Sequence, residues 1–117
     1  MAQPVIAIFD IGKTNKKFFL FDEKLQEIKE EYVKIPLIQD EDGEECDDLI
    51  KLTEWVREKV QVICDSGKYV LKALNFSTYG ASLVHINEKG EPVTPIYNYL
   101  KIFPKDLHEE FYGKYPE

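Results

Sequence analysis

Hydrophobic and polar residues alternate with a period that changes along the chain, and each change marks a predicted element. Residues 5 to 10 form a nearly continuous apolar run rich in Val and Ile, which is typical of a strand covered on both faces. Residues 17 to 21 form a second strand, and a polar turn joins the two into a hairpin. The next apolar positions fit a helix or a strand. We predict a third strand over residues 27 to 35, because residues 22 and 23 indicate a turn and Val, Ile and Tyr favour extended structure.

An amphipathic helix is predicted to follow. Its apolar positions recur every three to four residues, at Leu49, Leu52, Trp55, Val56, Val60 and Ile63. Asp47 or Asp48 suits the N-terminus of this helix, where a carboxylate caps free N–H groups, and Gly67 marks its end. We expect Trp55 to pack in the core rather than to stack on a sugar, and Cys64 to belong to the same buried face.

The last third of the chain completes an α/β pattern. After the crossover helix, residues 70 to 76 predict a strand parallel to the first one, with a right-handed connection. Residues 83 to 86 and 93 to 97 predict an added strand pair joined by a glycine turn. A final helix is expected to begin after Pro104 and to end at Gly113.

One segment before the helix is strongly acidic. Residues 40 to 48 contain Asp40, Glu41, Asp42, Glu44, Glu45, Asp47 and Asp48. A divalent-ion site is one interpretation, but the run lacks the alternating ligand spacing of a calcium loop. We predict a solvated acidic loop.

Composition narrows the class of protein. The chain has 117 residues, and 44% hydrophobic with 13% aromatic content is enough for the core of one globular domain. Its formal net charge of -7 argues against nucleic-acid and anionic-membrane partners, because both require a basic surface. A local basic cluster can still bind a small anion, and Lys13, Lys16 and Lys17 form one.

The two cysteines and the first residues of the chain indicate the cellular compartment of the protein. The two cysteines, Cys46 and Cys64, are not arranged as a CxxC pair or as a disulfide framework, so we expect free thiols and a reducing cytoplasm. Residues 1 to 4 lack a basic stretch, and the apolar run behind them is too short for a signal peptide or a membrane helix. We therefore expect no membrane targeting.

The turn between the first two strands has the residue types that phosphate binding requires. Backbone N–H groups around Gly12 can converge on phosphate oxygens, and Thr14 and Asn15 add side-chain donors. Asp10, at the end of the first strand, can hold a hydrated divalent cation. The alternative is an ordinary polar hairpin turn, although such turns favour Asn-Gly or Asp-Gly at their tip.

Two motifs resemble a known family. Asp-x-Gly-x-Thr-Asn at residues 10 to 15 resembles the first phosphate motif of the sugar kinase, Hsp70 and actin superfamily. Residues 74 to 99, with Thr-Tyr-Gly at positions 78 to 80, resemble FGGY-family carbohydrate kinases, above all the fuculokinase and rhamnulokinase branch. That branch has Asp where this chain has Ser82, and many relatives have a Trp-containing segment ending in Arg where Tyr99 is followed by other residues.

The resemblance implies a fold and a phosphate site. The fold is a ribonuclease H-like (actin-like ATPase) half-domain, a mixed sheet of three antiparallel strands plus a parallel strand after a crossover helix, with the added strand pair. Asp10 would hold Mg2+ through water. ATP phosphates would be lined by Gly12, Thr14, Asn15 and Lys17, with Lys17 where many relatives have Arg. Lys13 would contact phosphate or extend into solvent.

The resemblance also places a sugar at the end of the parallel strand, where open α/β sheets bind ligands. The residues implied are Thr78, Tyr79, Gly80, Ala81, Ser82 and Tyr99. Tyr79 could instead be a half-buried aromatic residue at a strand end. His85 and His108 are expected on the surface and not as catalytic bases.

The function implied is ATP-dependent phosphorylation of a small sugar. The sequence holds neither a second glycine-rich adenosine motif nor the late Asp that serves the family as a base. Residues 1 to 117 are therefore expected to be the N-terminal part of a two-domain kinase, inactive alone and self-associating through uncovered apolar faces. The alternative is a non-catalytic binding or assembly module on the same half-fold. A chaperone-like or actin-like ATPase is disfavoured by residues 78 to 80.

Overall fold

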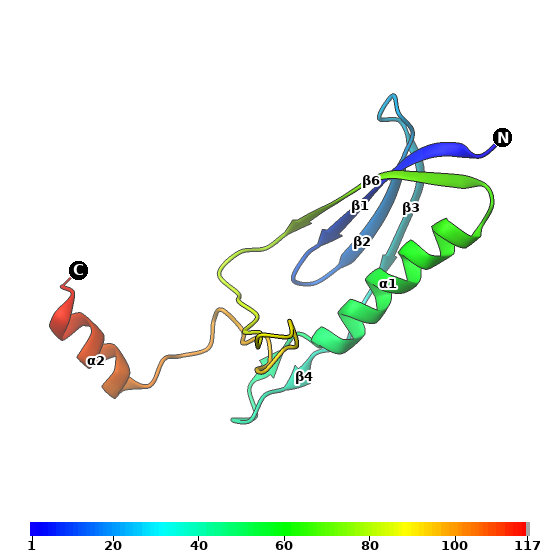
Figure 1. The fold of residues 1–117 in the computed structure, drawn as a ribbon. Helices are drawn as coiled ribbons and strands as arrows, with labels where there is room; N and C mark the ends of the chain where they lie inside the picture. Colours follow the sequence, from blue (N-terminus) through cyan, green and yellow to red (C-terminus); the bar gives the residue numbers. More distant parts are fainter. Residues whose placement is uncertain (117) are drawn as a thin grey trace.

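A four-stranded mixed sheet, covered on one face by a long helix, forms the body of the molecule (Figure 1). The computed structural model describes residues 1 to 116. The strand order is β3-β2-β1-β6, with β1 parallel to β6 and antiparallel to β2, and β2 antiparallel to β3. The elements are β1 Gln3–Ile11, β2 Lys16–Phe21, β3 Glu27–Val33, α1 Leu49–Asp65 and β6 Tyr69–Thr78. The predicted order of three antiparallel strands, a crossover helix and a parallel strand is confirmed.

The core lies between the sheet and α1. Alternate residues of β1 and β2 point at the helix, and they are buried with two residues of α1: Val5, Ala7, Phe9, Phe18, Leu20, Trp55 and Ile63. The ring centroid of Phe9 lies 5.1 Å from that of Phe18 and 5.3 Å from that of Trp55. The prediction that Trp55 packs in the core is therefore confirmed.

Helix α1 begins and ends close to the predicted residues. The Asp48 side chain accepts a hydrogen bond from the Lys51 backbone N–H at 3.1 Å, and Ser66 is the C-cap. Gly67 follows with a φ of 67°, a left-handed conformation that glycine adopts without strain. The placement of Cys64 on the buried face was wrong, because that thiol is exposed. Each helical residue turns the side chain by about 100°, so the residue after buried Ile63 faces outward.

The acidic run is not the solvated loop that its charge predicted. The short strands β4 Ile38–Gln39 and β5 Glu45–Cys46 pair as a hairpin. Asp40, Cys46, Asp47 and Asp48 are buried, while the other acidic residues of the run are exposed. The Asp40 carboxylate accepts hydrogen bonds from the backbone N–H groups of Asp42 and Glu44, which closes the hairpin tip. Local backbone donors and distant lysines thus replace water around the buried carboxylates.

The predicted strand pair at residues 83 to 86 and 93 to 97 does not form. Only single bridges, Ile86 with Pro92 and Asp47 with Ile96, occur in this stretch, although the turn between residues 87 and 91 is present. Pro92 and Pro95 have no N–H group, so a regular ladder cannot run through them.

A charged contact fixes this irregular segment to the hairpin β4–β5. The Lys101 ammonium group lies 2.6 Å from an Asp40 oxygen and 2.8 Å from an Asp42 oxygen. Hydrogen bonds to these two carboxylates raise the Lys101 pKa, and burial opposes that rise. The Tyr97 hydroxyl donates to Glu41, also on the hairpin. The hairpin β4–β5 therefore holds the irregular segment that precedes the last helix through these contacts.

Helix α2 Lys105–Lys114 stands apart from the sheet at the end of an extended lead (Figure 1). It begins after Pro104, as predicted, and extends one residue beyond Gly113. Its position makes the molecule elongated, with extents of 63 × 30 × 28 Å. Within residues 1 to 116, no helix has both the length and the apolar character that crossing a membrane requires.

Candidate functional site

The turn between β1 and β2 is closed by a backbone contact that requires glycine. The Gly12 N–H donates to the Asn15 carbonyl at 2.9 Å. A Cβ atom at residue 12 would lie 2.7 Å from that carbonyl oxygen, closer than a real contact permits. Thr14 and Asn15 are exposed at the tip, where their polar groups are free to meet a ligand. The predicted phosphate turn is thus a tight loop with solvent-facing donors.

Replacing Gly12 with Ala is expected to lower the free energy of unfolding by roughly 1–3 kcal/mol, because the added methyl group pushes the turn open. Chemical denaturation of the chain measures this loss. Gly113→Ala is the matched control, since no atom lies within 4 Å of the added Cβ in that helix. The control should unfold like the parent or at slightly higher denaturant. Equal midpoints for both variants would show that the turn tolerates a side chain.

Asp10 and Lys17 face each other across β1 and β2 next to this turn. Strand alternation places both on the sheet face opposite α1, since their neighbours Phe9 and Phe18 face the helix. Both are half-buried. In the described part of the chain, no three His, Cys, Asp or Glu residues gather as a metal site. Mg2+ usually keeps several waters and needs one or two carboxylates beside substrate phosphates, so Asp10 alone fits a hydrated ion.

A second carboxylate, Asp47, lies at the centre of a cluster that the sequence did not reveal. The Lys13 ammonium group is 2.9 Å from one Asp47 oxygen, and the Lys16 ammonium group is 3.1 Å from the other. The Tyr79 hydroxyl donates to Asp47 as well. Lys16 is only 2% exposed and also donates to the Lys13 carbonyl at 3.1 Å. Three segments, the turn, the start of α1 and the end of β6, therefore meet at one carboxylate.

Burial and hydrogen bonds in this cluster shift the pKa values of Asp47 and Tyr79. Burial acts to raise the pKa of Asp47, but the hydrogen bonds from Tyr79, Lys13 and Lys16 outweigh it, so the pKa is lowered. Burial of the Tyr79 phenol, followed by its hydrogen bond to the Asp47 carboxylate, raises the pKa of Tyr79. At neutral pH, Asp47 is therefore ionised and Tyr79 keeps its proton.

Two aromatic rings lie next to the ammonium group of Lys13 in the turn. The Lys13 ammonium group lies 5.2 Å from the centroid of the Tyr79 ring and 5.5 Å from that of Tyr99. These distances suit cation–π attraction. The ring centroids are 6.3 Å apart. The prediction for Lys13 is a contact with phosphate or an extended position in solvent. In this structure its ammonium group points toward the predicted sugar residues Tyr79 and Tyr99.

The end of β6 lies against the turn. The Thr78 hydroxyl donates to the Ile11 carbonyl of β1 at 3.2 Å, which joins the ends of the two parallel strands. Beyond Gly80 the backbone reverses at Ala81, whose φ of 59° is uncommon for a residue with a side chain. The Ser82 hydroxyl is shielded from solvent and lacks a hydrogen-bond partner among the described residues. The structure thus brings Thr78, Tyr79 and Tyr99 to the turn, with the predicted loop around Ser82 beside them.

Lys16 and Asp47 were missed, although the sequence held a signal for the first. Positions 16, 18 and 20 lie on one face of β2, and Phe18 and Leu20 are apolar. A lysine on a buried strand face requires a carboxylate partner. No local pattern shows which of the seven acidic residues of the run supplies it.

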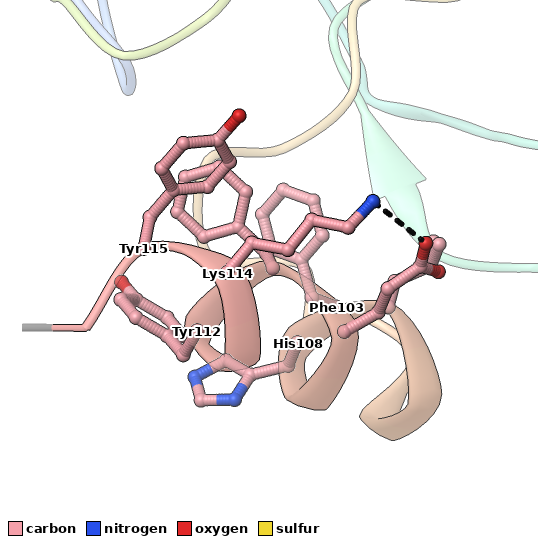
Figure 2. Close-up of a pocket in the computed structure, with 8 residues that line it drawn as sticks. Phe103, His108, Tyr112, Lys114 and Tyr115 are labelled. Carbon is pink, nitrogen blue, oxygen red and sulfur yellow. Dashed lines mark ion pairs between the residues drawn. The ribbon is translucent and has the colours of Figure 1, made fainter.

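A hollow lies beside helix α2, far along the chain from the turn. Figure 2 shows Phe103, His108, Tyr112, Lys114 and Tyr115 around it, and the Lys114 ammonium group lies 3.7 Å from Glu110. His108 packs on Tyr112 at 4.6 Å between ring centroids and is exposed. Its predicted place on the helix surface is confirmed, and the hollow is lined by α2 and the residues that flank it.

Comparison with known proteins shows the fold. No family model and no curated protein matches the sequence. The structure matches a carbohydrate kinase from Novosphingobium aromaticivorans over 97% of this chain, with a TM-score of 0.81 at 16% identity. The chain has a sugar-kinase fold. Plasmodium falciparum glycerol kinase with ADP matches over 97% (TM-score 0.70, 21% identity), and Lactobacillus acidophilus gluconate kinase over 80% (TM-score 0.66, 22% identity).

The chain spans only part of those proteins. It covers 23% of the Novosphingobium chain, 24% of the Plasmodium chain and 19% of the Lactobacillus gluconate kinase. At these identities the likeness concerns the fold, and the residues of the site have to be argued from their own geometry.

Proposed function

We propose that this chain is the first part of an ATP-dependent carbohydrate kinase of the FGGY family, which transfers the γ-phosphate to a hydroxyl of a small sugar in the cytoplasm. One observation supports the proposal above others. The glycine-closed turn after β1 and the Thr-Tyr-Gly end of β6 lie side by side, joined by the hydrogen bond from Thr78 to Ile11. A phosphate site and a sugar site built on these two strand ends would face each other across one sheet edge.

In this proposal the residues of the turn bind the nucleotide. The backbone around Gly12 and the exposed side chains of Thr14 and Asn15 donate hydrogen bonds to phosphate oxygens. Lys17 adds a positive charge on the same sheet face as Asp10. Asp10 would hold Mg2+ through water, and the ion would supply charge neutralisation when bound. The neighbouring Lys13 balances Asp47 in the structure and leaves this phosphate role to its neighbours.

The residues at the end of β6 bind the acceptor. Tyr79 and Tyr99 offer ring faces to the apolar side of a sugar, and the Ser82 hydroxyl, which has no partner within residues 1 to 116, offers a hydrogen bond. The Thr-Tyr-Gly motif favours a sugar of the kind taken by the fuculokinase and rhamnulokinase branch. Assaying ADP release from the full-length protein with pentoses, hexoses and their 6-deoxy forms tests the function directly.

Tyr79→Ala tests the sugar role. In the full-length protein it should raise the Michaelis constant for the sugar roughly 10-fold, and it should leave that for ATP nearly unchanged, because the backbone donors of the turn around Gly12 stay in place. Steady-state kinetics with each substrate varied in turn measures both constants. Tyr115→Ala is the control, since Tyr115 follows α2 as its C-cap, far along the chain from the turn. An equal loss for both substrates would assign Tyr79 to packing instead.

A further inference from the structure

Asp47 belongs to neither strand end of the proposed site, yet it contacts both. It lies between β5 and the N-terminus of α1, and a single bridge ties it to Ile96 of the irregular segment. One of its carboxylate oxygens receives Lys16, and the other receives Lys13 and Tyr79. Its side chain is 4% exposed. Asp47 is therefore a buried junction between the turn, which is the proposed phosphate side, and Tyr79, which is the proposed sugar side.

The ionised state of Asp47 determines the direction of its hydrogen bond with Tyr79. An ionised carboxylate only accepts hydrogen bonds, so Tyr79 has to be the donor. The Tyr79 oxygen then keeps its lone pairs for an incoming hydroxyl. Two ammonium groups on one carboxylate leave a net positive charge beside the two tyrosine rings. An acceptor that offers a hydroxyl donor to Tyr79 matches this arrangement.

We propose that Asp47 is a positioning residue for the sugar: it holds the Tyr79 hydroxyl as a hydrogen-bond acceptor toward the substrate and holds the Lys13 ammonium group between Tyr79 and Tyr99. This inference rests on the proposed function. It adds a residue from the acidic run to a site whose other members come from the turn and the strand end. Asp47 acts through Tyr79 and Lys13 and touches neither substrate.

Asp47→Asn removes the charge and offers a donor where Tyr79 needs an acceptor. The expected result in the full-length protein is a rise of roughly 10-fold in the Michaelis constant for the sugar, with that for ATP changed less than about 2-fold, since the turn's backbone donors stay in place. In a Tyr79→Phe background the same substitution should add little further, because the hydroxyl that Asp47 orients is gone. Independent, multiplying effects of the two substitutions would overturn the proposal.

Two further variants separate positioning from folding. Asp48→Asn is the matched control: it is the adjacent buried aspartate, it caps α1, and Asn caps helices equally well. It should leave both Michaelis constants unchanged. If Asp47→Asn fails to fold because Lys16 is left buried without a partner, the double variant Lys16→Met with Asp47→Asn removes both charges together. The double variant should show the same selective effect on the sugar.

A readout without kinase activity tests the same link. Nitration by tetranitromethane needs the tyrosine phenolate, so Tyr79 should react slowly in the parent and several-fold faster in Asp47→Asn, as peptide mass spectrometry would show. Exposed Tyr115 should react alike in both proteins. An unchanged Tyr79 rate overturns the positioning role whatever the enzyme does. A faster Tyr79 rate in a full-length protein without sugar-dependent turnover would overturn the proposed function and leave only the physical link between Asp47 and Tyr79.

Discussion

Asp10→Asn in the full-length protein is expected to lower the rate of sugar-dependent ATP turnover on the order of 100-fold or more. The substitution keeps the shape of the side chain and removes the charge that would hold Mg2+ against the phosphates. The loss should appear in kcat rather than in the sugar's Michaelis constant, because the interaction strengthens as charge develops during transfer. Steady-state kinetics at saturating ATP and Mg2+ measures the effect.

The structure provides a control for this experiment in the second strand-end aspartate. Asp22 follows β2 and accepts hydrogen bonds from the backbone N–H groups of Lys24 and Gln26, both at 2.9 Å. Asn can accept the same bonds, so Asp22→Asn should leave turnover unchanged. Both variants should melt close to the parent. Near-normal turnover of Asp10→Asn would remove the metal role from Asp10 and weaken the assignment of Thr14 and Lys17 to phosphate.

Phe9→Ala is expected to have the largest effect on stability, a loss of roughly 3–5 kcal/mol in the free energy of unfolding. Phe9 is fully buried at the centre of the core, where it contacts Phe18, Trp55 and Phe76. Truncation removes these contacts and leaves a cavity that a β-sheet cannot collapse to fill. Denaturant unfolding followed by Trp55 fluorescence measures the loss, because the only tryptophan lies against the same ring.

Phe111→Ala makes the same chemical change on α2 and is the control. Phe111 is 55% exposed, and its ring packs on those of Tyr112 and Tyr115 in the same helix region. Its loss should change the free energy of unfolding by no more than about 0.5 kcal/mol. A cost as large as that of Phe9→Ala would mean that α2 packs against a partner, such as a second copy of the chain.

The secondary structure of the body could be predicted because its signals are local. The apolar run of β1, the turn at residues 22 and 23 and the helical spacing around Trp55 each lie within one element. The polar turn around Gly12 was located by the same means, since Gly12 and its neighbours are contiguous, and its phosphate role stays a prediction. One failure also has a local cause. The apolar residues near Pro92 and Pro95 predict strands, but those prolines cannot complete a ladder.

By itself, the sequence determined the four strands of the sheet and the helix that covers it, the burial of the face bearing Phe9 and Trp55, and the place of the polar turn, because periodicity and turn chemistry act within a few residues. Only the tertiary structure decided which charges meet. Lys16 and Asp47 are 31 positions apart, and Lys101 and Asp40 are 61 positions apart. A buried charge is stable only beside its partner, and that partner is determined by how the hairpin β4–β5 and the segment after β6 meet next to the turn at the end of the sheet.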